Sequence, residues 1–413
     1  MKVAVIGSGI SGLSAAHYLS KNFKVDLFEK NDHFGGHSHT LDIIDENNIV
    51  PVDIGFIVFN FQTYPNFINF LNDNNVEIEK SNMSFSVSVK GTNIEYCGKG
   101  LFGIFSNKKN LLNFNFFKMF FEIIKFYKKS NNLKNIDENL KLDDFLAKEG
   151  MSKYFINYHI VPMVSAIWSM PPYEAKQMPL KFFLKFFQNH GLFNLKNRPQ
   201  WYTIKNRSRT YVNKILKTIS GEYYKNYKIN KLSRYPNGVK IYYGGKNEFF
   251  DYDKVIIATH ADEALSLINE PTEDEKKILS NFKYKTNCAI VHTDETVMPK
   301  NRKAWCSWNS SVNKDNNSQT SITYWLNLLQ NLNTKKNIFL SLNPFHIIEQ
   351  NKIIEKINFT HPYYDKAALD NQKKLKHIQN KNNTLFCGSY FGYGFHEDGI
   401  KSSLEMIKYF NDK

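Results

Sequence analysis

The sequence predicts an α/β fold that opens with parallel strands, and three patterns near its start carry this prediction. Residues 3–6 form an apolar run with the length of a buried strand, and a glycine-rich loop follows at once. The spacing of Leu13, Ala16 and Leu19 then indicates one apolar face of a helix. A second strand pattern covers residues 24–28. Strand, helix and strand in this order predict a parallel βαβ unit.

The glycine-rich loop has the pattern G-x-G-x-x-G. Such glycines permit a tight turn, close approach of the backbone to a pyrophosphate, and tight packing of the helix on the strand. The N–H groups that open the helix favour the same anion. A carboxylate at the end of the second strand can accept hydrogen bonds from ribose hydroxyls. An ordinary αβ turn is the alternative, but it would need all these features to coincide. The predicted dinucleotide site comprises Gly7, Gly9, Ile10, Ser11, Gly12 and Glu29.

The residues after Glu29 indicate which dinucleotide binds. Lys30 follows the acid directly, and Gly35-Gly36-His37 begins six residues beyond it. This arrangement resembles the extended motif of the flavin-containing amine oxidase superfamily, which includes monoamine oxidases, phytoene desaturases and protoporphyrinogen oxidases. There the glycine pair brings the backbone against the FAD pyrophosphate and flavin. The resemblance implies a Rossmann-type, amine-oxidase-like domain that binds FAD rather than NAD, with contacts from Lys30, Gly35, Gly36 and His37. No cysteine or histidine stands in a recognisable attachment context, so noncovalent FAD is expected.

The end of the chain supplies a second match to this superfamily. Residues 386–389 have the pattern of a strand that enters a loop, and residues 397–403 open a final helix. In the superfamily's similar closing motif, the helix N-terminus points at the flavin and stabilises negative charge on the reduced ring. This chain departs from the motif at Ser389, where the superfamily has an acid, and at Asp398 and Ser403, where it has small residues. The similarity implies cofactor contacts from Gly388, Asp398, Gly399 and Ile400.

A middle segment completes the expected cofactor domain. Residues 227–232 and 239–242 alternate as strands around Asn237-Gly238, a strong hairpin signal. Residues 252–259 indicate a buried parallel strand. In the superfamily the backbone near the first of these strands binds adenine, which implies Ile229 in this chain.

The resemblance also implies how the 413 residues divide. The FAD-binding domain would be discontinuous and comprise 1–62, 205–265 and 380–413. An inserted mixed α+β substrate-binding domain would comprise 63–204 and 266–379. Its expected strands include 84–89 and 288–292, helices dominate 101–190, and residues 313–317 suggest a solvated loop.

Cysteine use and hydropathy bear on the compartment. Cys97, Cys288, Cys306 and Cys387 show neither a metal-ligand spacing nor a C-x-x-C motif, so a reduced, cytoplasmic compartment is expected. His37 and His39 would share a strand face without a third ligand, which leaves a metal there as the minor alternative. The first strand begins at the N-terminus, so no signal peptide is expected. No apolar run reaches the ~18 residues that span a bilayer.

The net charge of +15 has two interpretations. One is composition, because Lys, Asn, Ile and Phe all abound. The other is an anionic membrane surface, because aromatic and lysine residues interleave at 114–129 and again at 181–187. The same two stretches could instead be core helices, and both interpretations stay open here. A nucleic-acid partner is not expected, since no binding module accompanies the charge. A peripheral position on the inner face of the membrane is thus one expectation.

Phrases outside the cofactor motifs narrow the resemblance. Several short phrases are similar to one bacterial subgroup of NAD/FAD-binding flavoproteins, often encoded beside cyclopropane-fatty-acid-synthase-like methyltransferases. They are residues 63–66, 82–86, 162–163, 166–169, 189–192, 198–201 and 394–399. The resemblance covers essentially the whole chain. One departure is Asn206-Arg207, where the subgroup tends to carry Gly-Gly.

The resemblance implies an FAD-dependent oxidoreductase. Such enzymes take a hydride from a substrate C–H bond onto the flavin. The subgroup implies a lipid or fatty-acyl substrate: an unsaturated acyl chain of a phospholipid, with or without a methyl branch, that is desaturated on the way to a diene or furan fatty acid. His190 and His396 are the candidates for catalytic groups near the flavin, and the alternative for each is a structural histidine bonded to backbone.

Two other functions remain open at this point. One is a flavin amine oxidase, which would need an aromatic cage around a neutral amine. The other is a non-catalytic flavin-binding partner of a lipid methyltransferase. Reduction of FAD by lipid would separate an enzyme from a scaffold.

Overall fold

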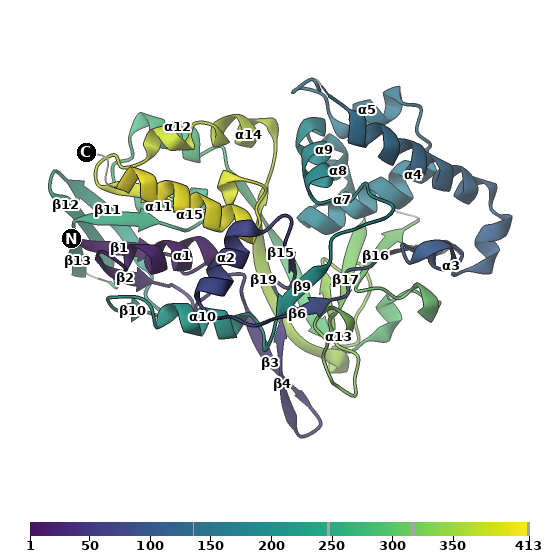
Figure 1. Cartoon of the computed structure of the whole chain (residues 1–413), viewed down its shortest axis with the longest axis horizontal. Helices are drawn as coiled ribbons and strands as arrows, with labels where there is room; N and C mark the ends of the chain where they lie inside the picture. Colours follow the sequence, from purple (N-terminus) through teal and green to yellow (C-terminus); the bar gives the residue numbers. More distant parts are fainter. Residues whose placement is uncertain (135, 246–247, 315–318, 411–413) are drawn as a thin grey trace.

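The structure is a computed structural model that describes residues 1–134, 136–245, 248–314 and 319–410 (Figure 1). The chain begins with the expected βαβ unit, which consists of β1 (Lys2–Ile6), α1 (Ile10–Leu19) and β2 (Lys24–Phe28). The two strands pair in parallel, with Val3 opposite Val25. The prediction of a parallel sheet is therefore confirmed.

The parallel sheet draws its strands from three distant parts of the sequence. Its five strands lie in the order β10-β2-β1-β14-β20. The added strands are β10 (Tyr223–Tyr224), β14 (Lys254–Ile257) and β20 (Thr384–Phe386), and all pairings are parallel. Figure 1 shows this sheet at the end of the molecule that holds both termini.

Alternate residues of β1 serve two different cores, as the period of a strand requires. Val3 and Val5 pack with α1, α2 (Pro65–Asp73), α10 (Ser208–Leu216) and α15 (His396–Phe410). Ala4 and Ile6 pack on the other face. That face is covered by the antiparallel strands β11 (Ile229–Tyr235), β12 (Gly238–Tyr243) and β13 (Glu248–Tyr252), and by α11 (Ala261–Leu267) and α12 (Glu273–Leu279). The hairpin predicted at Asn237-Gly238 is the β11–β12 turn.

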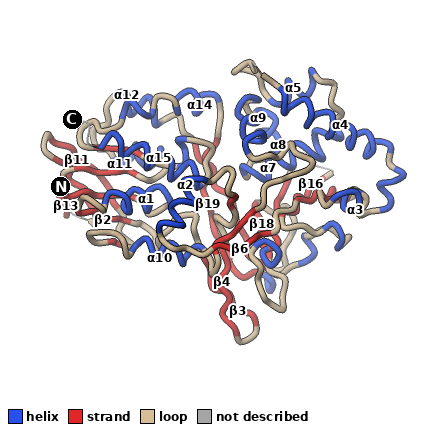
Figure 2. The backbone as a smooth tube through the Cα atoms, in the orientation of Figure 1, coloured by secondary structure: helices blue, strands red, loops and turns tan. Residues whose placement is uncertain are grey.

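A second sheet fills the middle of the molecule. Its seven strands lie in the order β19-β15-β18-β17-β16-β7-β8. They are β7 (Phe85–Lys90), β8 (Glu95–Cys97), β15 (Lys283–His292), β16 (Trp308–Asn313), β17 (Thr320–Trp325), β18 (Phe339–Leu342) and β19 (Ile353–Tyr363). The strands expected at 84–89 and 288–292 correspond to β7 and the end of β15. Of the loop expected at 313–317, residues 315–317 lie outside the described residues. Figure 2 shows these strands between two groups of helices.

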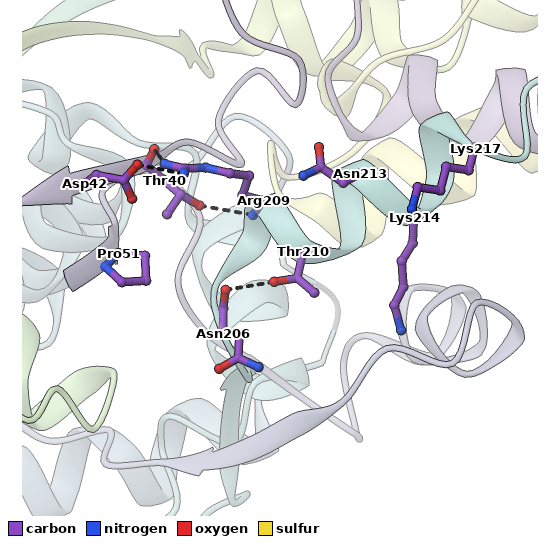
Figure 3. Close-up of a pocket in the computed structure, with 9 residues that line it drawn as sticks. All are labelled: Thr40, Asp42, Pro51, Asn206, Arg209, Thr210, Asn213, Lys214 and Lys217. Atoms are coloured by element: carbon purple, nitrogen blue, oxygen red, sulfur yellow. Dashed lines mark hydrogen bonds and ion pairs between the residues drawn. The ribbon is translucent and has the colours of Figure 1, made fainter. Parts of the chain in front are cut away.

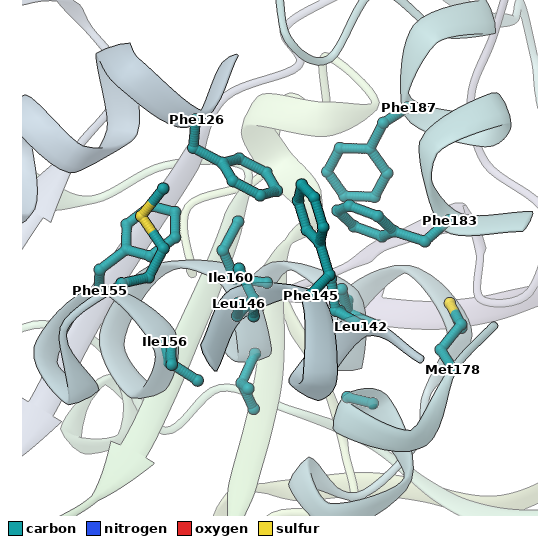
Figure 4. Close-up of a cluster of buried hydrophobic side chains, with 14 of the residues drawn as sticks. Phe126, Leu142, Phe145, Leu146, Phe155, Ile156, Ile160, Met178, Phe183 and Phe187 are labelled. Atoms are coloured by element: carbon teal, nitrogen blue, oxygen red, sulfur yellow. The ribbon is translucent and has the colours of Figure 1, made fainter. Parts of the chain in front are cut away.

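Helices form the end of the molecule away from the termini (Figure 1). They are α3 (Gly100–Ile104), α4 (Phe114–Asn132), α5 (Leu142–Lys148), α6 (Lys153–Phe155), α7 (Val161–Trp168), α8 (Pro172–Gln177) and α9 (Leu180–Asn189). Phe126 of α4, Phe145 of α5 and Phe183 and Phe187 of α9 meet in one aromatic-rich core (Figure 4).

The two phenylalanine- and lysine-rich stretches behave differently in this lobe. The aromatic residues of α9 are all buried, so the core interpretation holds for 181–187 and a membrane-facing role is wrong for that stretch. On α4 only one face is buried, and Phe114 and Phe121 stay exposed. Among the described residues, no helix is both long and apolar enough to cross a bilayer.

The remaining strands link the two halves. β3 (Thr40–Asp45) and β4 (Asn48–Asp53) form a hairpin. β5 (Phe59–Asn60), β6 (Ile78–Ser81) and β9 (Trp201–Ile204) form a small antiparallel sheet. Two short helices, α13 (Leu326–Leu329) and α14 (Lys366–Gln372), follow β17 and β19 in the chain.

Candidate cofactor and active site

Two helices present their N-termini side by side at the carboxyl end of the parallel sheet. A Cβ added to Gly399 of α15 would lie 2.7 Å from Cγ2 of Ile10 and 2.8 Å from Oγ of Ser11, both in the first turn of α1. Four residues further along each helix, the hydroxyls of Ser14 and Ser403 lie 2.7 Å apart. The helices are therefore parallel, and both positive dipole ends point the same way, which suits a bound anion.

The loop glycines have separate physical roles. Gly7 has a φ of +98°, and its N–H donates to the carbonyl of Phe28 at 2.8 Å. A Cβ on Gly12 would stand 1.8 Å from the carbonyl oxygen of Gly7, so this glycine is needed for packing. A Cβ on Gly9 would meet nothing within 4 Å, whereas one on Gly36 would lie 3.1 Å from Cα of Gly9. Gly9 and Gly36 therefore offer bare backbone around an open space, a cradle that fits a pyrophosphate.

Glu29 holds this loop in place. Its Oε2 accepts from N and Oγ of Ser8, at 3.0 and 2.6 Å. Its Oε1 accepts from N and Nδ2 of Asn31, at 2.9 and 2.8 Å. A carboxylate accepts about four hydrogen bonds, so a ribose diol would replace Ser8 Oγ or Asn31 Nδ2 rather than find a free oxygen.

The predicted adenine end lies beside Glu29. Tyr227 donates its N–H to the carbonyl of Glu29 at 2.8 Å, which brings the start of β11 to the end of β2. Ile229 opens β11 and is buried in the same core as Phe28. Lys30 is half-exposed and pairs with Glu263 at 2.5 Å, so its side chain points to the protein surface.

The imidazole of His37 has a buried ring nitrogen that indicates a missing hydrogen-bond partner. It directly follows Gly36, and its Nε2 is buried with no hydrogen-bond partner. Its ring lies 5.2 Å from the rings of both Phe359 and His361. Burial, reinforced by the neighbouring His361 and His260, holds the pKa of His37 well below its usual range. A neutral, buried and unpartnered imidazole nitrogen fits a site whose hydrogen-bond partner is a bound group.

His396 opens α15 within a hydrogen-bonded network. Its Nε2 lies 2.9 Å from Oγ of Ser38, which also contacts the hydroxyl of Tyr211. Its ring stacks on Phe56, with the centroids 3.5 Å apart. Burial lowers the pKa of His396 to about 3, so the imidazole is neutral at pH 7.

His190 lies at the end of α9, on the other side of Phe395. Its Nδ1 is 2.9 Å from the carbonyl of Phe186, which requires Nδ1 to donate, and its ring stacks on Phe186 at 3.9 Å. Its ring centroid is 6.2 Å from that of Phe395, the residue before His396. Burial lowers the pKa of His190 to about 4. Both His190 and His396 are thus neutral imidazoles at pH 7, so proton donation by an imidazolium is disfavoured at either position.

Two acidic residues of the closing motif accept hydrogen bonds at the N-termini of helices. Glu397 accepts from N and Nδ2 of Asn66, at 3.1 and 2.6 Å, and from N of Phe67 at 3.0 Å, which caps α2. Asp398 accepts from N of Phe395 at 3.0 Å, which closes the first turn of its own helix. Burial raises the pKa of Asp398 to about 6. The departure from a small residue at this position therefore has a structural cause. Of the neighbouring predicted residues, Ile400 is fully buried, and the N–H of Gly388 donates to Oγ of Ser402 at 2.9 Å.

An aromatic wall lies beside the start of α15, and most of it was not predictable from a sequence motif. Phe186 lies 4.6 Å from Trp168 and 5.2 Å from Phe395, measured between ring centroids. Phe182 lies 5.0 Å from Tyr364. The Nε1 of Trp168 and the hydroxyl of Tyr364 are buried without hydrogen-bond partners. An apolar wall with two unpartnered donors can hold a largely apolar ligand that carries an acceptor.

The Asn206-Arg207 departure is also explained. Asn206 has a φ of +62° and Arg207 a φ of +76°, a region that favours glycine. The guanidinium of Arg207 is held by the carbonyls of Pro51 and Gln330, at 3.0 and 2.8 Å. Beside it, a surface groove of about 430 Å³ runs along α10 (Figure 3). It is lined by Thr40, Asp42, Pro51, Asn206, Arg209, Thr210, Asn213, Lys214 and Lys217.

Metal ligands do not gather in the described part of the chain. Within those residues, no group of three or more His, Cys, Asp or Glu side chains is arranged to hold a metal ion. The ring of His39 stacks on that of His33, with the centroids 4.0 Å apart.

Comparisons with known proteins bear on the fold. Residues 5–73 match the NAD(P)-binding Rossmann-like domain. A CLA-producing fatty acid isomerase from P. acnes is similar over 99% of this chain and 98% of its own, with a TM-score of 0.69 and 15% identity. Cyclohexylamine oxidase from Brevibacterium oxydans IH-35A is similar over 98% of this chain and 98% of its own, with a TM-score of 0.67 and 14% identity. Putrescine oxidase bound to putrescine covers 99% of this chain and 98% of its own, with a TM-score of 0.70 and 11% identity.

No curated protein sequence matches the chain. The structural similarity spans at least 98% of each of the three proteins compared. The expected amine-oxidase-like fold is therefore confirmed. The fold therefore includes both the Rossmann-type domain and the lobe built around the second sheet.

Proposed function

We propose that this chain is a flavoenzyme that binds FAD noncovalently and oxidises a lipid-type substrate. The observation that carries the proposal is the pair of parallel helix N-termini joined at Gly399, beside the bare backbone of Gly9 and Gly36. A dianionic pyrophosphate gains from both dipoles and from unhindered N–H groups there. The unpartnered Nε2 of His37 stands next to this cradle.

Bound FAD would supply hydride acceptance from a substrate C–H bond. The chain's own residues bind and orient it. Gly9, Gly36 and the first turn of α1 would hold the pyrophosphate, and Glu29 with the start of β11 would hold the adenosine end. The N-terminus of α15, which adjoins that of α1, would also stabilise negative charge on the bound cofactor. The stacked rings of Phe56 and His396 would exclude water at the start of α15.

We further propose that the substrate is an unsaturated, methyl-branched acyl chain of a phospholipid. Net removal of two hydrogens from the acyl chain would form a conjugated diene, with FAD as the hydride acceptor and water as the proton acceptor. The aromatic wall of Trp168, Phe182 and Phe186 supports an apolar ligand, and the unpartnered hydroxyl of Tyr364 could donate to an ester oxygen. The likeness to a fatty acid isomerase is consistent with this class.

Anaerobic reduction of the bound flavin tests the proposal. Holoprotein is mixed with phospholipid that carries a monounsaturated, methyl-branched chain, with its saturated counterpart and with a panel of primary amines. We expect bleaching of the visible flavin absorbance by the unsaturated lipid alone, with a diene in equal amount by mass spectrometry. Bleaching by an amine instead would favour an amine oxidase, the function of two proteins of the same fold. No bleaching by any compound would favour a non-catalytic partner of a lipid methyltransferase.

A further inference from the structure

The segment that leads into α4 carries an unusual amount of exposed apolar surface. The exposed fractions are 49% for Leu111, 93% for Leu112, 81% for Phe114 and 64% for Phe121. Half-buried Phe117 lies between the two exposed phenylalanines. Phe114, Phe117 and Phe121 also line a shallow groove of about 450 Å³ with Lys118, Glu122 and Lys125. We call Leu111, Leu112, Phe114, Phe117 and Phe121 the α4 patch.

The α4 patch is separate from the face of α4 that packs into the hydrophobic core. Phe116, Met119, Phe126, Tyr127 and Ser130 form the buried face of α4. The exposed face is a separate stripe at helical spacing, which alternates aromatic residues and lysines. Its members are Phe114, Lys118, Phe121, Lys125 and Lys128.

The charge around the α4 patch is predominantly positive. Residues 100–134 contain seven lysines and one carboxylate, that of Glu122. The oxygens of Glu122 accept from N and Oγ of Ser152, at 3.0 and 2.5 Å, so this carboxylate is directed to the neighbouring α6. Lys129 pairs with Glu149 at 2.6 Å. Lys118, Lys125 and Lys128 remain on the outward stripe.

We propose that the α4 patch docks this protein on an anionic lipid bilayer. The leucines and phenylalanines would enter the boundary between headgroups and acyl chains, and the lysines of the stripe would reach the headgroup phosphates. A bilayer interface offers an apolar and an anionic layer at once, which suits a stripe that mixes both residue types. Figure 1 places α4 at the end of the molecule away from the parallel sheet. Docking there leaves the cofactor domain clear of the bilayer and does not depend on which substrate is oxidised.

Vesicle co-sedimentation of the holoprotein tests the docking. Vesicles contain phosphatidylglycerol mixed with phosphatidylcholine, or phosphatidylcholine alone, at low and high salt. We expect binding to the anionic vesicles at low salt and at least about tenfold weaker partition to the zwitterionic ones, since each interfacial lysine contributes on the order of 1 kcal/mol. High salt should weaken binding without abolishing it, because the apolar part is not screened.

Two variants and two matched controls locate the surface. Leu112→Ser/Phe114→Ser/Phe121→Ser should reduce partition about tenfold or more, as should Lys118→Glu/Lys125→Glu/Lys128→Glu. The apolar control is Ile44→Ser/Ile49→Ser, which removes the equally exposed isoleucines of the β3–β4 hairpin. The charge control is Lys21→Glu/Lys217→Glu/Lys225→Glu, three exposed lysines near the parallel sheet.

Each outcome decides the proposal. All four variants change exposed side chains, and unchanged thermal unfolding and FAD content confirm that each is folded. Loss of binding in the first two with retention in both controls supports docking through the α4 patch. Wild-type protein that ignores anionic vesicles at low salt would overturn it, and the α4 patch would then be assigned to a protein partner. Equal losses in the controls would also overturn it, because binding would then follow net charge alone.

Discussion

Single residues at the candidate site are explained by backbone geometry and by unmet hydrogen bonds. The left-handed conformations of Asn206 and Arg207 account for a Gly-Gly preference in similar sequences, and the carbonyls that hold the Arg207 guanidinium offset the strain. The glycine motif was predictable because its requirements are local. The isolation of His37 Nε2 was not, since it depends on Phe359 and His361, far away in the sequence.

The unpartnered nitrogen of His37 leads to a prediction. His37→Phe keeps the ring volume but removes the nitrogen, so FAD affinity should fall by about 1–3 kcal/mol, the cost of an unmade hydrogen bond in a buried site. Titration of apoprotein with FAD, followed by flavin fluorescence, measures this change. His346→Phe is the matched control, because Nε2 of His346 is also buried and unpartnered but lies near Lys90, in another part of the fold. Equal FAD affinity in the two variants would remove His37 from the site.

At the scale of elements, the sequence predicts local units well and their partners poorly. The βαβ unit, the β11–β12 hairpin and the final helix each follow from patterns within about 30 residues. The residues of α4 and α9 share one composition, yet α9 is buried and α4 is half exposed, because only tertiary contacts decide which face is covered. The closing motif shows the same limit, since the helix that Glu397 caps lies more than 300 residues earlier in the chain.

The cap on α2 gives a second prediction. Glu397→Ala leaves the N–H groups of Asn66 and Phe67 without acceptors, so the free energy of unfolding should fall by about 1–2 kcal/mol. Glu397→Gln keeps one oxygen acceptor and should lose less. Chemical denaturation of the holoprotein measures both changes. Glu405→Ala, on the exposed face of the same helix, should be close to neutral; a loss there as large as in Glu397→Ala would mean that α15 itself, and not the cap, is affected.

For the whole molecule, buried histidines should make the fold sensitive to acid. Burial lowers the pKa of His159 and His396 to about 3 and that of His190, His292 and His361 to about 4, and holds that of His37 well below its usual range. In the unfolded chain these six imidazoles titrate near 6.5, so below that pH the unfolded state binds more protons and stability is lost. Asp53 and Asp398 act in the opposite direction, because burial raises the pKa of each to about 6.

Six imidazoles outweigh two carboxyls, so the net effect has a definite sign. The free energy of unfolding should decrease as the pH falls from 6.5 to 4.5, and the slope gives the protons taken up on unfolding. Thermal melts across this range measure the effect. His159→Gln, which removes one imidazole remote from the cofactor site, should flatten the slope by up to about 1.4 kcal/mol per pH unit. Stability that rises on acidification would contradict this account.

The proposed function depends on noncovalent FAD lying against the open backbone of Gly9, where the N-termini of α1 and α15 meet. The most direct measurement is acid precipitation of the purified protein, with identification of the flavin in the supernatant by chromatography. We expect a yellow protein that releases FAD, close to one per chain, and a folded but colourless Gly9→Val variant, because the added side chain fills the open space next to that glycine. A flavin that stays with the precipitated polypeptide, or full FAD content in a folded Gly9→Val variant, would contradict the claim.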